Sequence, residues 1–377
     1  MPTKTVKKLR LNKKTKRVLK ILGIIVIITL GFFLFYRSNI NDLKRMGYSE
    51  KAANNILFKF KKDYAIKMGK NKTLNAAFES DDYIEDNLDS YAKITYRDHK
   101  HLIKNINTLL KKKYNNNQIS TIITHGDDKA VSEFAKRDKV RYLDEFYTLD
   151  FAKLDLYDRY VDFMGVSRED APNSVVFVNL DLDKENYQDP VVIDTFSNDM
   201  LVTKHRALTD KFTPPALVTF DKKYTKSTDK VKGSKEAVNS AIEMMEDAYK
   251  EGLLLLVNSG YRSYKDQEEL VEEYRKAYGD NYVDKYIALA GFSEHQTGLA
   301  FDFASGKKNV FATSDEYKWI MDNAYKYGFI YRFPVGGEDI TGFQSEAWHY
   351  RYVGKEIATK CHEEGITFDE YWAKYLF

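Results

Sequence analysis

An apolar run without a single charged residue, from Ile21 to Tyr36, limits what this chain can fold into more than any other feature of its 377 residues. The run reads ILGIIVIITLGFFLFY, and a basic residue flanks it on each side, Lys20 and Arg37. A membrane-spanning helix needs about 20 apolar residues, but long basic side chains at the ends of a shorter helix reach the membrane interfaces. We therefore predict a transmembrane helix over residues 21–37.

The charge distribution gives this helix a direction. Residues 1–37 contain ten of the 59 lysines and arginines and none of the 56 acidic residues, so the rest of the chain is mildly acidic. Because basic segments that flank a membrane helix stay in the cytoplasm, we expect residues 1–20 to be a cytoplasmic tail and everything after Arg37 to be extracytoplasmic. An acidic ectodomain is a poor partner for nucleic acid, so none is expected.

A cleavable signal peptide would show the same charged start and apolar run. Two features favour an uncleaved anchor instead: no small-x-small cleavage site follows Tyr36, and no cysteine is there to accept a lipid. The only cysteine of the chain is Cys361, which excludes an intrachain disulfide and a cysteine-rich zinc site. We expect a single-pass protein of the cell membrane.

Residues 38–199 are rich in lysine, asparagine and acidic residues, with apolar residues at helix-like spacing, as in LKRMGYSEKAANNILFKF. A turn, a polar cap and an amphipathic stretch recur there in three imperfect copies, MGYSEKAANNIL, KYNNNQISTII and MGVSREDAPNSVV. The region has no cluster of chemically competent side chains, because His99 and His101 point to different faces of a helix. We expect a mainly helical extracytoplasmic spacer, with a wall-associated module as the alternative.

From about residue 200 the pattern changes to a mixture of helices and strands. The pair Pro214–Pro215 leads into a helix over residues 235–251, which the apolar strand LLLLVNSGYRS follows. A second helix over residues 266–278 precedes the strand LAFDFAS. Helices and strands mixed in this way predict an α+β domain over residues 200–377.

Three segments of this domain hold the residue types that a hydrolytic zinc site requires: SGYRSYKDQ, SEHQTGLAFDF and SEAWHYRYVG. A catalytic zinc takes three protein ligands and keeps a fourth position open for water. His295, Asp302 and His349 supply such a set. Asp302 lies between two phenylalanines in an apolar strand, where an unpaired carboxylate would be costly to bury. A zinc ion, the nearby Arg262 or a hydrogen-bond network would each satisfy it.

Four further residues complete the predicted site. Glu346 lies three residues before His349 and is placed to move a proton between water and a leaving amine. Since an i, i+3 pair on a regular strand points to opposite faces, we expect Glu346 on the loop that enters the strand. Arg262 follows a Ser-Gly turn and would hold a carboxylate or an oxyanion with its guanidinium fork. Gln267 and Ser293 would hydrogen-bond a peptide backbone.

These segments, together with NAYKYGFIYRFPVGGEDITGF, resemble the VanY-type D-alanyl-D-alanine carboxypeptidases, a zinc peptidase family that also contains peptidoglycan L,D-carboxypeptidases. The resemblance covers residues 200–377 and rests on the pattern S-x-H-x6-D followed by E-x-x-H. It implies a D,D-peptidase/Hedgehog-like α+β fold, a small antiparallel sheet with flanking helices. The chain departs from the family at Phe292, where histidine is usual, and at Ala347, where proline is usual.

The resemblance also implies a role for each residue of the predicted site. The two histidines and the aspartate would bind zinc, Glu346 and Arg262 would be catalytic, and Arg262, Gln267 and Ser293 would bind substrate. The expected reaction is removal of the terminal D-Ala from peptidoglycan stem pentapeptides. The alternatives are an L,D-carboxypeptidase or an endopeptidase acting on peptidoglycan peptides, and a non-catalytic wall-binding protein that keeps the fold.

Overall fold

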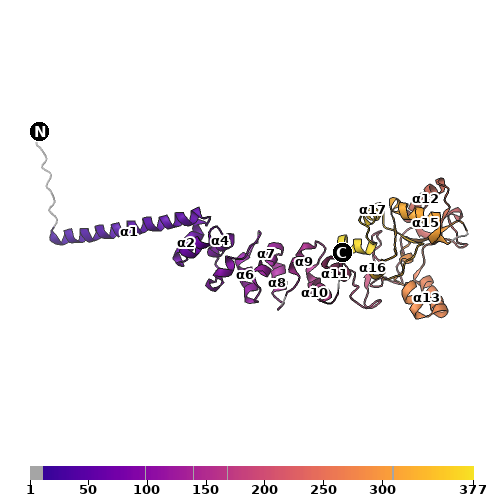
Figure 1. The fold of residues 1–377 in the computed structure, drawn as a ribbon, viewed down its shortest axis with the longest axis horizontal. Helices are drawn as coiled ribbons and strands as arrows, with labels where there is room; N and C mark the ends of the chain where they lie inside the picture. Colours follow the sequence, from indigo (N-terminus) through magenta and orange to yellow (C-terminus); the bar gives the residue numbers. More distant parts are fainter. Residues whose placement is uncertain (1–11, 98, 139, 168, 308–309) are drawn as a thin grey trace, which may run out of the picture. The chain divides into compact units, whose positions relative to one another are not determined.

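The structure of this protein is a computed structural model that describes residues 12–97, 99–138, 140–167, 169–307 and 310–377. Contacts divide the chain between Thr148 and Leu149 into two compact units (Figure 1). Residues 1–11 of the predicted cytoplasmic tail lie outside the described residues.

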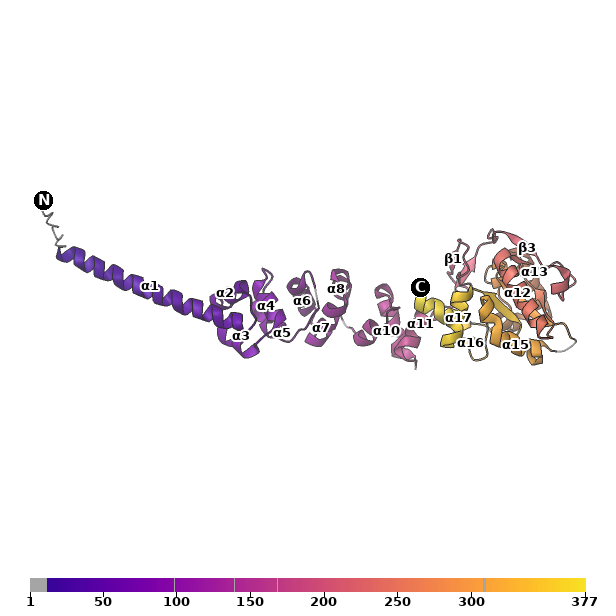
Figure 2. The ribbon, with the colours of Figure 1, turned by 90° about the horizontal axis from the view of Figure 1, so that it is seen from above.

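The first unit begins with one long helix, α1 (Lys13–Arg45), which is continuous in both ribbon views (Figures 1 and 2). Asn12 caps its start by accepting a hydrogen bond from the backbone N–H of Thr15. An 18-residue window of α1 has a mean hydropathy of 2.7 and is 0% buried. By length and composition α1 is able to cross a membrane, although a signal sequence has the same properties. The predicted apolar helix is present, and it continues beyond the apolar run to Arg45.

Shorter helices make up the rest of the first unit, and its described part contains no strand. They are α2 (Glu50–Phe58), α3 (Lys62–Met68), α4 (Lys72–Glu79), α5 (Leu88–Tyr91), α6 (Leu102–Lys111), α7 (Asn116–His125), α8 (Asp128–Phe134) and α9 (Leu143–Thr148). Polar side chains start four of them by accepting a backbone hydrogen bond, namely Ser49, Asn71, Asn115 and Asp127. The helical region that the sequence predicts after the apolar helix is confirmed.

The second unit begins with two helices that precede the predicted catalytic domain, α10 (Tyr157–Val166) and α11 (Ala171–Asn179). Side chains of α11 share a buried cluster with α18 (Phe368–Tyr375) at the end of the chain. The amide of Asn179 also donates a hydrogen bond of 3.0 Å to the carbonyl oxygen of Ala373. The compact unit therefore reaches back to Leu149, whereas the sequence suggests a boundary near residue 200.

A four-stranded antiparallel sheet, in the order β5-β6-β8-β7, lies at the centre of the second unit. Its strands are β5 (Leu255–Ser259), β6 (Ala300–Ser305), β7 (Phe329–Tyr331) and β8 (His349–Tyr352). Two shorter pairs lie outside it, β1 (Val191–Ile193) with β2 (Arg206–Leu208) and β3 (Leu217–Thr219) with β4 (Lys232–Ser234). The small antiparallel sheet that the sequence predicts is confirmed.

Further helices accompany this sheet in the second unit, as expected of an α+β fold, and Figure 2 labels all of them except α14. They are α12 (Lys235–Lys250), α13 (Tyr264–Tyr278), α14 (Asp280–Tyr286), α15 (Asp315–Asn323), α16 (Glu338–Thr341) and α17 (Lys355–Glu364). Met244 of α12 belongs to the same buried core as Phe301 and Phe303 of β6. Because successive residues of a strand point to opposite faces, Asp302 projects from the other face of β6. That face carries the candidate site.

Candidate metal and catalytic site

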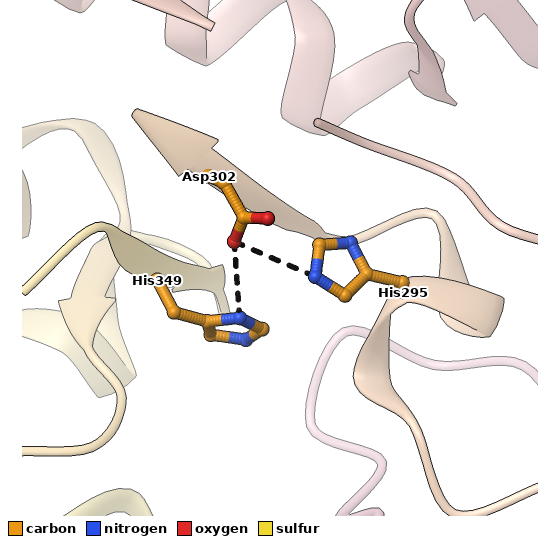
Figure 3. Close-up of side chains that lie close together, drawn as sticks. All are labelled: His295, Asp302 and His349. Carbon is orange, nitrogen blue, oxygen red and sulfur yellow. Dashed lines mark ion pairs between the residues drawn. The ribbon is translucent and has the colours of Figure 1, made fainter. Parts of the chain in front are cut away.

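The two histidines and the aspartate that the sequence predicts as metal ligands lie together (Figure 3). Asp302 in β6 pairs with His349 in the register of the sheet, and the short helical turn Glu294–Thr297 positions His295. Asp302 Oδ1 lies 3.5 Å from His295 Nε2 and 3.3 Å from His349 Nδ1. One ligand atom from each residue lies within 4.8 Å of the others. The three side chains therefore form a compact set of donor atoms.

A hydrogen bond on the far nitrogen orients each imidazole ring. His295 Nδ1 lies 2.7 Å from the backbone oxygen of Gly260, and His349 Nε2 lies 3.4 Å from Oε2 of Glu294. Carbonyl and carboxylate oxygens accept hydrogen bonds, so each of these nitrogens carries the hydrogen. In the neutral rings the lone pairs are then on His295 Nε2 and His349 Nδ1, which face Asp302. Histidine ligands of metals are oriented in this way.

The environment of Asp302 fits a bound cation. Its Oδ1 is buried and has no hydrogen-bond partner among the described residues. Burial favours the neutral acid, but His295 and His349 outweigh it and lower the pKa of Asp302. Two imidazole nitrogens and one carboxylate oxygen are a donor set that zinc accepts in hydrolytic sites, with the fourth position left open. The residues present therefore fit a zinc ion.

His349 is the ligand at which a metal competes with a proton. Burial lowers its pKa, but the neighbouring carboxylates of Asp302 and Glu294 outweigh burial and raise the pKa to about 9. Metal ligands must be deprotonated, so a metal ion at this position replaces the proton on His349 Nδ1.

Glu346 lies beside the ligand set, in the loop that enters β8, as the sequence predicts. Its Oε2 is 3.6 Å from His349 Nδ1, and its side chain is 17% exposed. Burial raises the pKa of Glu346 to about 7, against an opposing effect of His349. A carboxyl group with a pKa near neutrality is suited both to accept and to return a proton.

The guanidinium of Arg262 is held by neutral side chains. Arg262 Nη1 donates to Oε1 of Gln267 at 2.5 Å, and Nη2 donates to Oγ of Ser259 at 3.3 Å. Gln267 in turn donates to the carbonyl oxygen of Ala288 at 2.6 Å, which fixes its amide. Among the described residues Arg262 forms no ion pair, so its positive charge remains available for an anion in the cavity.

A single cavity of about 440 Å³ brings the predicted residues together. Its lining includes all seven of them, Arg262, Gln267, Ser293, His295, Asp302, Glu346 and His349. Aromatic side chains form other parts of its wall, namely Tyr274, Tyr282, Tyr286, Phe292, Phe333, Phe343 and Trp348. Phe292, which departs from the family pattern, thus contacts the space that a substrate would occupy. The cavity therefore combines the polar groups of the predicted site with a largely aromatic wall.

Sequence reasoning missed Glu294, which lies between two predicted site residues. Its Oε1 accepts hydrogen bonds from Arg332 Nε at 2.8 Å and Arg351 Nη1 at 3.1 Å, while Oε2 faces His349. Arg332 also pairs with Asp369 of α18, and all of these side chains are buried. Burial alone would raise the pKa of Glu294, but the two arginines outweigh it and the pKa is lowered. The sequence did contain one sign of this buried network, because both arginines lie among aromatic residues, in FIYRF and HYRYV.

Comparisons with known proteins find relatives of the part of the chain that holds this site. The family model described as VanY, D-alanyl-D-alanine carboxypeptidase, matches residues 230–355. A putative carboxypeptidase, YodJ, from Bacillus subtilis (strain 168) is 39% identical over 181 residues, which cover 46% of this chain and 66% of that protein. A D-alanyl-D-alanine carboxypeptidase from Enterococcus faecalis is 37% identical over 139 residues, 34% of this chain and 51% of that protein. The chain thus spans at most 66% of the length of these two relatives.

Two solved structures are similar over the same region. The LdcB LD-carboxypeptidase is 35% identical, with a TM-score of 0.45, and the match covers 50% of this chain and 91% of that one. A Zn(II) complex of a vancomycin resistance D,D-pentapeptidase VanY variant is 30% identical, with a TM-score of 0.40, over 46% of this chain and 98% of that one. With its complete set of site residues inside the matched residues 230–355, this chain belongs to the VanY-type D-alanyl-D-alanine carboxypeptidase family.

Proposed function

We propose that this protein is a zinc-dependent carboxypeptidase that removes the terminal D-Ala from peptidoglycan stem pentapeptides. The observation that carries the proposal is the convergence, in one cavity, of three residues able to hold a metal ion, a carboxyl group of near-neutral pKa and an arginine that forms no ion pair within the described part of the chain. The D-alanyl-D-alanine carboxypeptidases among its relatives support the substrate.

His295, Asp302 and His349 would hold the zinc ion, through the three atoms that face one another. When bound, zinc supplies Lewis acidity, which lowers the pKa of a water and polarises a carbonyl group. Glu346 is the catalytic base in this proposal: it accepts a proton from the attacking water and returns it to the amine of the leaving D-Ala. Its carboxylate oxygen lies 3.6 Å from Nδ1 of His349, next to the atoms that would hold the ion.

Arg262 binds the negative charge that a carboxypeptidase must neutralise, either the C-terminal carboxylate or the developing oxyanion. Gln267 and Ser259 orient its guanidinium from behind. We also assign Gln267 and Ser293, which line the same cavity, to substrate binding.

We propose further that α1 anchors the protein in the cell membrane as a single pass, with residues 1–20 as a cytoplasmic tail and the site outside. Asn39, Ile40 and Leu43 of α1 are buried in the first unit. The residues directly after the apolar run are therefore part of a folded helix, which supports an uncleaved anchor over a signal peptide. Residues 38–199 would be a spacer or a wall-associated region that precedes the zinc carboxypeptidase domain, residues 200–377.

Metal analysis and product masses test the activity. Purified full-length protein in detergent is expected to contain one zinc per chain and to convert pentapeptide muropeptides to tetrapeptides with loss of alanine. Glu346→Ala should retain zinc but lose turnover by a factor of about 10² to 10⁴, whereas His295→Ala should lose zinc. Full activity of Glu346→Ala would refute the mechanism.

The 35% identity to an LD-carboxypeptidase favours a second candidate, removal of the last residue from tetrapeptides. The same assay separates the two, because a tripeptide product identifies L,D-specificity. Cleavage of cross-linked dimers would instead indicate an endopeptidase. A chain that binds peptidoglycan without zinc and without products would be a binding protein.

A further inference from the structure

Two phenylalanines in the first unit are almost fully exposed. Phe58 ends α2 and is 81% exposed, and Phe60 in the turn between α2 and α3 is 93% exposed. On the other side of α2, Ala52, Ala53 and Ile56 are buried, so α2 itself is packed normally. Phe60 also has a φ of 54°, a left-handed conformation that is unfavourable for a bulky side chain. The turn therefore presents apolar rings outward at a cost in backbone conformation.

The contacts of α2 place this turn along α1. Lys44 pairs with Glu50 at 2.9 Å near the end of α1, whereas Tyr36 Oη donates to Asn54 Oδ1 at 2.8 Å further back. These two interactions show that α2 runs antiparallel to α1. Phe58 lies one helical turn beyond Asn54, about 6 Å further in the direction of the apolar run. The turn is therefore level with the last helical turn of the apolar run, which ends at Tyr36.

Other contacts hold the turn in this position. The side chain of Lys62 at the start of α3 hydrogen-bonds that of Asn39 in α1. Lys59 lies 4.5 Å from the ring centroid of Tyr83, and Lys61 pairs with Glu85. The lysines that flank the two phenylalanines thus fix the turn and leave both rings exposed.

We propose that this turn is a second membrane contact, in which Phe58 and Phe60 insert into the interface of the bilayer that α1 crosses. The inference rests on the proposal that α1 spans the membrane. The bilayer is the expected partner because the turn continues the apolar surface of α1. Phe32, Phe33 and Phe35 of α1 are also exposed, and the turn adds two more rings at the level where this apolar surface ends. Apolar side chains at an interface bury themselves about 5–10 Å deep. With two contacts, α1 and this turn, the first helices are fixed in orientation against the bilayer, whereas α1 alone would leave them free to rotate relative to it.

Tryptophan reporters in the full-length protein, reconstituted in vesicles with brominated lipids, test the contact. Phe58→Trp and Phe60→Trp probe the turn, and Phe33→Trp probes α1. Lys51→Trp is the matched control, because residue 51 is exposed on the same face of α2 as Phe58 but about 10 Å further along the helix. The fluorescence of the three native tryptophans is measured on the wild-type protein and subtracted.

The expected result is strong quenching and a blue shift for Phe58→Trp and Phe60→Trp, several-fold greater quenching than for Lys51→Trp. Quenching of Phe33→Trp without quenching of the turn reporters would overturn the contact and leave the anchor intact. Equal quenching at the turn and at Lys51→Trp would also overturn it, since α2 would then lie flat on the bilayer. A Phe33→Trp reporter that is not quenched would refute the anchor, and the inference with it. Turnover of soluble muropeptides by the Phe58→Ser/Phe60→Ser variant should equal that of the wild type.

Discussion

Replacing Glu294 by glutamine tests whether a buried carboxylate positions the proposed metal ligand His349. The carboxylate accepts hydrogen bonds from Arg332 and Arg351 and faces His349 Nε2 at 3.4 Å. Glutamine keeps the shape but removes the charge, and its amide group offers a donor where an acceptor is required. Arg332 would then keep Asp369 as its acidic partner, whereas Arg351 would keep only backbone carbonyl oxygens among the described residues.

The structure gives the size of the expected effect. Removing one member of a buried, hydrogen-bonded ion pair costs about 3–5 kcal/mol, which for a domain of this size lowers Tm by roughly 10 °C. Loss of the group that orients a metal-bound histidine typically weakens metal binding by about 10- to 100-fold. We therefore expect Glu294→Gln both to lower the Tm of the metal-free protein and to weaken its zinc affinity.

Zinc affinity is measured by competition with a chelator, and stability by calorimetry of the metal-free protein. Glu316→Gln is the matched control, because Glu316 is also buried but accepts a hydrogen bond from the backbone of Leu254, away from the metal ligands. It should destabilise the protein without changing zinc affinity. If Glu294→Gln bound zinc as tightly as the wild type, or no worse than Glu316→Gln, the positioning role would be refuted.

Three further predictions concern the same site. Burial raises the pKa of Glu346 to about 7 in the metal-free protein. Because this pKa exceeds that of the unfolded chain, about 4.3, ionisation of Glu346 lowers the free energy of unfolding as the pH rises between these two values. The loss of stability is complete above about pH 7. Metal-free Glu346→Gln should therefore be more stable than the wild type at about pH 8, by up to about 3 kcal/mol. At about pH 4 it should not be more stable. Urea denaturation measures the free energy of unfolding, and an equal difference between variant and wild type at both pH values would contradict this prediction. Arg262→Lys keeps the positive charge but loses the guanidinium fork that Gln267 and Ser259 orient. In steady-state assays kcat/KM should fall by about 10- to 1,000-fold, while the zinc content is unchanged. Wild-type kinetics of this variant would show that Arg262 does not bind the anion. A chelator should abolish activity and lower Tm, and added zinc should restore both; activity that persists with metal-free protein would exclude a metal mechanism.

The sequence was sufficient to select residues that the structure brings together in one cavity, because its motifs are short and chemically specific. His295 and Asp302 are joined by one turn and one strand, and Glu346 and His349 by a single loop, so local geometry determines much of each pair. The α+β class and the apolar helix α1 also followed from hydropathy and helix caps, which are properties of adjacent residues.

The sequence could not reveal contacts between distant residues. Glu294 meets Arg332 and Arg351, 38 and 57 positions away, and nothing in a single segment indicates which arginine will face which acid. The turn at Phe58 likewise looks like any amphipathic stretch until α2 folds back along α1.

By itself, then, the sequence determined the residue types of the candidate site, the fold class and the apolar helix, since spacing and hydropathy act locally. Only the tertiary structure decided how these parts meet. The pairing of β6 with β8 places Asp302 opposite His349 and so brings the two halves of the candidate metal site together. Likewise α11 packs on α18, although nearly the whole sequence of the C-terminal unit separates the two helices. The physical reason is that burial and hydrogen bonding between distant segments depend on the folded path of the whole chain.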